Sequence, residues 1–549
     1  MRNFRIFQKR MRNFARPIMA VALFLVGTST NVLFAQNWDQ LIKTTASDRG
    51  SGDFFGFSVA ISGEYAIVGA YRADEDVTGN NYLSNAGAVY IFKNVAGTWT
   101  ETQKIVASDR GADDKFGYSV SISGDYAIVG AFEEDEDAVG GNTVDRAGAA
   151  YIFRIVGGVW SEIQKIVASD RSAYDEFGYS VAISGDYAIV GAYREDEDAA
   201  GGNTLSDPGS VYIYVNNSGT WSEAQKITAS DRADYDSFGK SVAIAGDYAI
   251  VGNMYDDEDE LGGNTILGSG SAYILKNNAG TWSEVQKIVA SDRGAGDVFG
   301  SSVAISGDHA IVGAYGDKDD ATGGNSLSYA GSAYIFENST GVWLETQKIV
   351  PSEREADDEF GISVAISGDY AIVGAYQEDE DTAGGNTISD AGSAYVFKKN
   401  TGSWTEVQKI IALDRGEEDN FGCAVAISGD YALVGAYNED EDASGGNTVS
   451  SAGSAYIFKN NFGAGVVENG FGKSLFIYPN PTSEKFSIDL GANFQNVQIT
   501  ITNIYGQLID SKILTPSQIL NLTIKEPAGI YILSVQAGEK KTVVRLVKE

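Results

Sequence analysis

Cysteine and histidine are nearly absent from this chain of 549 residues, which contains one of each, Cys423 and His309. A single cysteine excludes an internal disulfide framework and a thiolate zinc cluster, so stability must come from packing. Proline occurs only 7 times, against 65 glycines, 29 tyrosines and 25 phenylalanines. That composition is typical of many short strands joined by tight turns. It therefore predicts an all-β protein.

Basic residues are also scarce, because 40 Lys and Arg face 75 Asp and Glu and give a formal net charge of −35. Residues 1–35 hold six basic residues and no acid, so their removal lowers the net charge from −35 to −41. Residues 474–549 are nearly balanced, which places the excess of acid in the middle of the chain. Such a field opposes nucleic-acid binding and favours cations and basic partners.

Long apolar runs are missing except at the N-terminus. Residues 1–35 combine a basic stretch with an apolar run from Ile18 to Val26 and a cleavage position after Ala35, the pattern of a secretory signal peptide. No later segment approaches the ~20 apolar residues that a membrane-spanning helix needs. We therefore expect a mature chain without a transmembrane segment.

A Phe-Gly pair recurs at a constant interval of 61 residues, and all seven tryptophans keep the same interval. Seven tandem copies of a strand-rich unit predict a seven-bladed β-propeller. The pairs begin at Phe55, Phe116, Phe177, Phe238, Phe299, Phe360 and Phe421. The tryptophans are Trp38, Trp99, Trp160, Trp221, Trp282, Trp343 and Trp404.

Each unit contains four strand-like runs, which make one blade. In one copy they cover Phe116 to Ile122, Tyr126 to Phe132, Gly148 to Phe153 and Trp160 to Val167. Only Ser-Gly-Asp separates the first two runs, which indicates a tight hairpin, whereas about fifteen acidic, glycine-rich residues join the second to the third.

The array opens with a lone tryptophan strand and closes without one. We therefore predict that Trp38 to Thr44 pairs beside Ser454 to Lys459, completing the last blade and leaving no open sheet edge. An open solenoid with frayed ends is the alternative.

The segment Phe177 to Tyr193, FGYSVAISGDYAIVGAY, resembles the FG-GAP repeat known from the propeller of integrin α subunits. The resemblance covers Trp38 to Phe458 in seven copies, and implies an extracellular propeller over residues 36–459 that binds ligands on one face. The integrin-type calcium loop lies between the first two strands of a blade, where this chain has only Ser-Gly-Asp. That calcium site does not carry over.

Residues 474–549 resemble a type IX secretion C-terminal sorting domain. The resemblance rests on Tyr478-Pro479-Asn480-Pro481, on alternating strands such as Lys485 to Leu490, and on a basic end. It implies a small β-sandwich that engages the type IX secretion machinery, with export through the periplasm to the medium or the outer cell surface. A purely stabilising β-sandwich is the alternative. Residues 460–473 are rich in Gly and Asn, like a linker.

Metal binding is the sharpest chemical hypothesis, because paired Asp at i and i+2, followed by Asn and flexible glycines, supply the hard oxygen ligands that calcium prefers. In the fifth blade Lys318 replaces the first Asp, so we expect poor binding there. A solvated acidic loop is the alternative. The candidate ligands are Asp135, Asp137, Asn142, Asp196, Asp198, Asn203, Asp257, Asp259, Asn264, Asp379, Asp381, Asn386, Asp440, Asp442 and Asn447.

Enzyme chemistry has little support. His309 occupies a repeat position that is tyrosine in other blades, and Cys423 occupies one filled by Tyr118, Tyr179 and Ser301. Neither pattern indicates a catalytic base or nucleophile, so we expect no catalytic residues. A carboxylate-based hydrolase stays open as an alternative, although acids repeated in every blade single out no acid and base.

Asp-Arg pairs precede the Phe-Gly step, as at Asp109-Arg110 and Asp170-Arg171. They are either a ligand ring on one face or structural pairs, in which the carboxylate accepts from turn amides and the Arg pairs locally or with the next blade. Periodicity favours the structural interpretation. Positions that break the repeat are the better places to test for function: Lys240, Asp207-Pro208, Asn253-Met254 and Pro351-Ser352-Glu353.

These observations predict a secreted or surface-displayed propeller that binds a protein or glycan and does not catalyse, with calcium as the expected ion of its acidic loops. The alternatives are an extracellular carboxylate-based hydrolase and a structural surface component.

Overall fold

The computed structural model describes residues 37–461 and, near the C-terminus, residues 476–478, 482, 484–494, 496–503, 508–514, 517–527, 529–537 and 540–548. The predicted signal peptide, residues 462–473 of the predicted linker and Pro479–Pro481 lie outside the described residues. The chain forms two compact units, one of which is Gln36–Gly463, while the other contains Ala464–Glu549. Secondary structure in the described residues is entirely β, and none of it is a helix able to cross a membrane.

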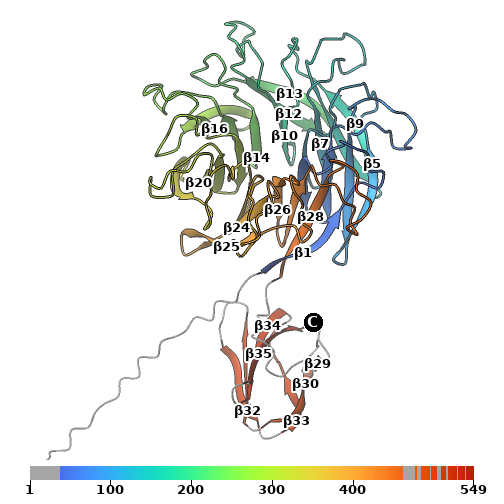
Figure 1. The fold of residues 1–549 in the computed structure, drawn as a ribbon, viewed down its shortest axis with the longest axis vertical. Helices are drawn as coiled ribbons and strands as arrows, with labels where there is room; N and C mark the ends of the chain where they lie inside the picture. The colour runs from blue at the N-terminus through green and yellow to red at the C-terminus, as the bar shows by residue number, and fades with distance from the viewer. Residues whose placement is uncertain are drawn as a thin grey trace, which may run out of the picture. The chain divides into compact units, whose positions relative to one another are not determined.

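The larger unit consists of seven four-stranded antiparallel sheets (Figure 1). The first strand of each sheet contacts its counterparts in the two neighbouring sheets, so the sheets are blades arranged around a common centre. The predicted all-β, seven-bladed architecture is therefore confirmed.

Blade 1 is β2 (Ser58–Ser62), β3 (Tyr65–Ala70), β4 (Ala88–Val95) and β5 (Thr98–Ile105); blade 2 is β6 (Ser119–Ser123), β7 (Tyr126–Ala131), β8 (Ala149–Val156) and β9 (Val159–Ile166); blade 3 is β10 (Ser180–Ser184), β11 (Tyr187–Ala192), β12 (Ser210–Asn217) and β13 (Thr220–Ile227). Blade 4 is β14 (Ser241–Ala245), β15 (Tyr248–Asn253), β16 (Ser271–Asn278) and β17 (Thr281–Ile288); blade 5 is β18 (Ser302–Ser306), β19 (His309–Ala314), β20 (Ser332–Ser339) and β21 (Val342–Ile349); blade 6 is β22 (Ser363–Ser367), β23 (Tyr370–Ala375), β24 (Ser393–Asn400) and β25 (Ser403–Ile410). Blade 7 is β26 (Phe421–Ser428), β27 (Tyr431–Ala436), β28 (Ser454–Asn461) and β1 (Asn37–Thr44).

The seventh blade takes its outer strand from the other end of the propeller sequence. Strand β1 pairs antiparallel with β28, which sets Trp38 opposite Asn460 and Thr44 opposite Ala455. Gln408 of blade 6 holds the same strand, because its side-chain amide donates to the carbonyl of Trp38 at 2.9 Å and accepts from the Trp38 amide at 2.7 Å. The ring is thus closed by strand pairing, at the strand that the phase of the repeat assigns to this role.

The Phe-Gly step lies just before the innermost strand in blades 1 to 6, so that strand is shorter than the sequence predicts, whereas in blade 7 the strand β26 begins at Phe421 itself. In blade 2, β6 begins at Ser119, while Phe116 forms a parallel bridge to Gly87 of the preceding blade. Gly117 has φ of +88°, and a Cβ there would lie 2.6 Å from the carbonyl oxygen of Ala88. Glycine therefore permits the close contact between blades, while the fully buried Phe116 fills the core beside it.

The tryptophans seal the contact between successive blades. Trp160 is 2% exposed, and its ring lies edge-on to Tyr65 of blade 1, with ring centroids 5.6 Å apart. The side-chain amide of Gln103 in blade 1 donates to the carbonyl of Trp160 and accepts from its backbone amide, as the side chain of Gln408 does with Trp38. These contacts repeat at 61-residue spacing, so successive blades pack on one another in the same way, except that Ile42 stands at the position of Gln103 beside Trp99.

The smaller unit contains two sheets, ordered β29-β30-β33 and β32-β31-β34-β35. Buried side chains from both sheets, including Ile488, Val497, Leu520 and Leu533, form one core. This is the two-sheet arrangement expected of a small β-sandwich. Its strands are β29 (Phe476–Tyr478), β30 (Lys485–Phe494), β31 (Val497–Asn503), β32 (Leu508–Leu514), β33 (Ser517–Thr523), β34 (Gly529–Ala537) and β35 (Lys540–Lys548).

Candidate ligand-binding face

The acidic loops with the predicted calcium ligands are held by their own hydrogen bonds. In blade 3, one oxygen of Asp198 accepts from the amides of Ala200 and Gly202 at 2.9 and 3.0 Å, and the other accepts from the Asn203 side chain at 2.5 Å. Asp196 accepts from the amide of Asp207 at 3.0 Å. The backbone amides of Gly202 and Ala200 hold the pKa of Asp198 below its ordinary value. These carboxylates therefore organise a turn of the backbone.

An arginine from the following connector fixes the same loop from outside. Arg232 donates to the carbonyl oxygens of Asp196 and Asn203 at 2.7 and 3.2 Å. Counterparts of Arg232 bind the equivalent carbonyls in the other candidate loops, which are Asp135 and Asn142, Asp257 and Asn264, Asp379 and Asn386, and Asp440 and Asn447.

Blade 5 shows that this loop does not need the first carboxylate. Arg354 donates to the carbonyl of Lys318 at 2.9 Å and to that of Asn325 at 3.1 Å, although Lys318 stands where the other loops have Asp. Asp320 still accepts from the amides of Thr322 and Gly324. The loop therefore forms without the first carboxylate, and calcium binding by the fifteen candidate residues stays a prediction.

Other acidic residues form groups of three carboxylates. Within the described residues, Asp109, Glu134 and Glu136 bring carboxylate oxygens within 4.8 Å of one another, as do Asp236, Asp256 and Glu258. Of these, Glu134, Asp236 and Asp256 are buried.

A lysine neutralises the buried acid of such a group. In blade 3, the ammonium of Lys226 lies 2.7 Å from Asp170 and 3.0 Å from Glu195, which has no exposed surface. The hydroxyl of Tyr212 donates to both carboxylates, at 2.8 and 3.0 Å. Sequence reasoning missed Lys226 and Glu195, although lysine recurs at that repeat position in every copy. The network links blade 3 to the connector that comes from blade 2, because Asp170 lies in that connector and Lys226 lies on β13.

The Asp-Arg pairs are structural, as their periodicity indicates, and the arginine binds an adjoining blade as expected, but the aspartate has other partners than the expected turn amides. Asp170 accepts from Lys226 and Tyr212 instead of turn amides, and Arg171 donates to the carbonyls of the acidic loop of blade 2. The turn amides bind a different aspartate, since Asp175 accepts from the amide of Ser172 at 2.6 Å.

That second aspartate recurs in all seven copies with a raised pKa. Burial raises the pKa of Asp236 to about 7 and that of Asp358 to about 7, from an ordinary value of 3.8. Burial likewise raises the pKa of the counterparts Asp53, Asp114, Asp175, Asp297 and Asp419. A feature common to every blade identifies a building element of the repeat and no single reaction centre.

Cys423 and His309 have structural surroundings. Burial raises the pKa of the Cys423 thiol to about 12, and its sulfur lies 3.6 Å from the carbonyl of Gly56. Burial, assisted by the nearby Lys399, lowers the pKa of His309, whose ring lies edge-on to Trp404 as tyrosines do in other blades. Neither environment activates a nucleophile or a base.

The positions that break the repeat have structural partners as well. Lys240 places its ammonium 4.1 Å from the ring centroid of Tyr179 and 3.9 Å from that of Tyr193. Met254 is 5% exposed, and Asn253 is fully buried. Glu353 replaces the usual Asp beside Lys409, at 3.3 Å.

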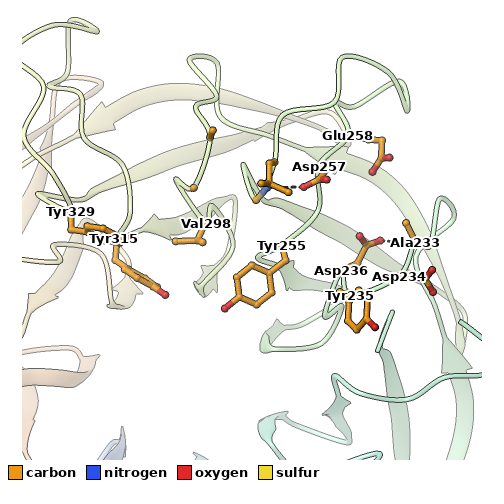
Figure 2. A pocket seen from close by; sticks show the side chains of 14 residues that line it. Ala233, Asp234, Tyr235, Asp236, Tyr255, Asp257, Glu258, Val298, Tyr315 and Tyr329 are labelled. Carbon is orange, nitrogen blue, oxygen red and sulfur yellow. Dashed lines mark hydrogen bonds between the residues drawn. The ribbon is translucent and has the colours of Figure 1, made fainter. Parts of the chain in front are cut away.

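A hollow of about 850 Å³ opens between blades 4 and 5 (Figure 2). Its walls are the two connectors that follow β13 and β17 and the two loops that follow β15 and β19. Four tyrosines line it, and Tyr235, Tyr255 and Tyr329 are 62%, 48% and 48% exposed. The remaining lining residues are Tyr315, Asp234, Asp236, Asp257, Glu258, Ala233, Leu267, Gly268, Ala295, Gly296 and Val298.

Missing side chains create this hollow. Gly268 and Gly296 stand where the interface between blades 2 and 3 has Arg146 and Tyr174. Gly316 follows Tyr315, and a Cβ at Gly316 would lie 2.1 Å from the carbonyl oxygen of Gly296, so only glycine permits this approach. Sequence reasoning missed these glycines, although alignment of the seven copies shows Gly268 and Gly316 as the single glycines at their repeat positions, while Gly296 shares its position with Gly52. The counterparts of Gly268 are Asn85, Arg146, Asp207, Tyr329, Asp390 and Ser451.

Comparison with known proteins identifies both units. The FG-GAP repeat model matches residues 38–92, 99–153, 160–214, 221–275, 282–336, 343–397 and 404–458. The secretion system C-terminal sorting domain model matches residues 476–549. A search of the curated proteins finds no match. The sorting domain indicates export, and the protein is secreted or located on the outer cell surface.

The FG-GAP matches cover more than half of the chain, and each of the seven runs from the outer strand of one blade to the third strand of the next. The chain therefore belongs to the FG-GAP repeat family of β-propeller proteins and carries a C-terminal sorting domain.

Proposed function

We propose that this exported propeller binds an extracellular ligand in the hollow between blades 4 and 5, and that it does so without catalysis. The observation that carries the proposal is the departure from the repeat at this one interface. Glycine replaces Arg146 and Tyr174 at the equivalent positions, and exposed tyrosines stand around the space. Exposed aromatic side chains around a concave surface are a common feature of binding sites.

The distribution of acids supports binding over hydrolysis. A hydrolase needs one carboxylic acid and one carboxylate with separate roles, and the hollow does contain Asp236, with its raised pKa, near Glu258. The same aspartate has a raised pKa in all the other copies, which have no glycine at the positions of Gly268 and Gly316. The raised pKa therefore accompanies the fold and does not distinguish the hollow.

The test uses the mature secreted protein in a binding screen and an activity screen. We expect it to bind immobilised peptides or glycans, and we expect Tyr255→Ala to abolish binding of the same ligands. Tyr174→Ala is the matched control, because Tyr174 is 48% exposed, like Tyr255, but lies at the interface between blades 2 and 3 and does not line this hollow. Release of reducing sugar from a panel of extracellular polysaccharides, lost in Asp236→Asn, would refute the proposal in favour of a hydrolase. Binding that is equal in both tyrosine variants would place the ligand site elsewhere.

A further inference from the structure

Blade 5 departs from the repeat at two facing positions of its second and third strands. His309 on β19 stands where the six other blades have tyrosine, and Glu337, directly opposite on β20, stands where five of them have lysine or arginine. Each of those five cations lies over the tyrosine of its own blade, at 5.0 to 5.7 Å from the ring centroid. Blade 5 therefore has neither the phenol ring nor the cation of this pair.

A cation reaches the same place from blade 6. The ammonium of Lys399 on β24 lies 2.7 Å from Nε2 of His309 and 2.8 Å from the carboxylate of Glu337, which is 3.9 Å from Nε2. The other copies have asparagine or isoleucine at the position of Lys399, and four of the asparagines accept a hydrogen bond from a turn glycine, as Asn338 does from the amide of Gly341. Three departures from the repeat, on three strands of two blades, thus meet at one point.

This group lies in the contact between the two blades. The imidazole of His309 lies edge-on to Trp404 of β25, with ring centroids 5.7 Å apart, and Trp404 is opposite Lys399 in the hairpin of β24 and β25. Trp404 is 2% exposed, and the side chains of His309 and Lys399 are 19% and 20% exposed. One imidazole therefore contacts both the lysine and the tryptophan that packs the two blades together.

The hydrogen bond between Lys399 and His309 requires a neutral imidazole. An ammonium can only donate, so Nε2 must accept, and a protonated imidazole has no lone pair with which to accept. Three carboxylates also act on the imidazole: Glu337 on the paired strand, Asp308 in the preceding turn and Asp369 in a hairpin of blade 6. Burial and the charge of Lys399 lower the pKa of His309 below its ordinary value of 6.5, against the opposing effect of these carboxylates.

We infer that the contact between blades 5 and 6 is sensitive to acid, because protonation of His309 breaks its hydrogen bond with Lys399 and places two cations beside one carboxylate. Of the seven contacts between blades, this is the one that contains the single histidine of the chain. The folded protein holds the imidazole neutral more strongly than the unfolded chain does. The stability that depends on the neutral imidazole is therefore complete above the ordinary pKa of 6.5 and is lost as the pH falls through the lower pKa of the folded state.

The single histidine permits a direct test on the mature protein, produced without a histidine tag. With isotope-labelled histidine, at about 150 mM salt, NMR follows this one imidazole as the pH is varied. We expect a titration midpoint below 6.5, and we expect Lys399→Asn, which installs the commonest residue of the other copies, to raise the midpoint. Lys276→Asn is the control, because it removes the same charge beside Tyr248 of blade 4, and it is expected to leave the midpoint within about 0.2 pH units.

Hydrogen exchange tests whether protonation reaches the contact between the blades. Between about pH 7 and about pH 5, and after correction for the intrinsic pH dependence of exchange, the amides of β24 and β25 are expected to exchange faster in the wild type. The amides of β12 and β13 in blade 3 are the internal reference and are expected to change little. His309→Tyr restores the tyrosine of the six other blades and is expected to abolish the acceleration in β24 and β25.

The wild-type titration alone can overturn the inference, even where a variant fails to fold. A midpoint at or above 6.5 in the wild type, or the same midpoint in the wild type and in Lys399→Asn, shows that Lys399 does not hold the imidazole neutral. Cooperative melting at about pH 8 establishes that each variant is folded. If the exchange of β24 and β25 then has the same pH dependence in the wild type and in His309→Tyr, protonation does not loosen the contact and the inference is wrong.

Discussion

Ring closure by the N-terminal strand predicts that equal tryptophan substitutions have unequal consequences. Trp38 and Trp221 have the same surroundings. Each is at most 2% exposed, each lies edge-on to a tyrosine with ring centroids 5.6 Å apart, and the carbonyl of each accepts a hydrogen bond from a glutamine side chain. Trp221 lies on β13, which a short hairpin joins to β12, whereas Trp38 lies on β1, which is joined to blade 7 only by hydrogen bonds and packing.

The expected magnitude follows from the side chain that is removed. Replacing a buried tryptophan by alanine costs about 3–5 kcal/mol in transfer and cavity terms, and we expect this loss for both Trp38→Ala and Trp221→Ala. Only Trp38→Ala is expected to release its strand, because the loss falls on a terminal segment of eight residues. A released β1 exposes the edge of β28, which is then available for pairing with another chain.

Thermal unfolding, limited proteolysis and light scattering distinguish the two variants. Both are expected to melt at a lower temperature than the wild type. Trp38→Ala alone is expected to be cut between β1 and β2 under native conditions and to associate in a concentration-dependent manner. If Trp38→Ala resists proteolysis and association as well as Trp221→Ala does, the reasoning about the closing strand is refuted.

Three further predictions concern the acidic network and the loops. Lys226→Met leaves the buried Glu195 without its cation and is expected to lower the free energy of unfolding, measured by chemical denaturation, by about 3–5 kcal/mol. Lys104→Met is expected to lower it less, because Ala73 stands at the position of Glu195 in blade 1. Equal losses in the two variants would contradict the role of the buried acid. Burial raises the pKa of Asp358 to about 7 from 3.8, so between these two pH values the folded protein keeps a proton that the unfolded chain releases. The group therefore contributes most to stability at low pH, and this contribution is lost as the pH rises through about 7. Relative to Asp358→Asn, the wild type is therefore expected to lose roughly 1.4 kcal/mol for each pH unit between about 4 and 7, and parallel stability curves would refute this assignment. The calcium prediction is tested by calorimetric titration of calcium into the chelator-treated protein: several saturable sites and a raised melting temperature are expected for calcium-ordered loops, and no heat and no shift at millimolar calcium would refute them.

Periodicity made much of the fold predictable. The 61-residue interval of Phe-Gly and tryptophan indicates seven equivalent blades, and the lone Trp38 at the start indicates which strand closes the ring. These features are repeated in the sequence because each blade must make the same contacts with its neighbours. The Ser-Gly-Asp turns are equally local, since glycine such as Gly124, with φ of +57°, is what a tight hairpin requires.

The roles of the acids were harder to predict, because carboxylates that look alike in the sequence have different partners in space. Asp198 binds amides within its own loop, whereas Asp170 meets Lys226, which is 56 residues later in the chain. A local pattern indicated the first kind of contact as readily as a metal site, and it contained no trace of the second.

What the sequence alone determined is the part of this protein that repeats: strand count, blade count, closure, the acidic character of the propeller and the sorting domain. Only the tertiary structure decided where the repeat leaves a space. Gly268, Gly296 and Gly316 stand in three separate segments of the chain, and the sequence shows Gly268 and Gly316 only as isolated substitutions, while Gly296 shares its repeat position with Gly52. They open one surface because neighbouring blades bring their loops together, so that the side chains missing from three segments leave a single hollow lined by tyrosines.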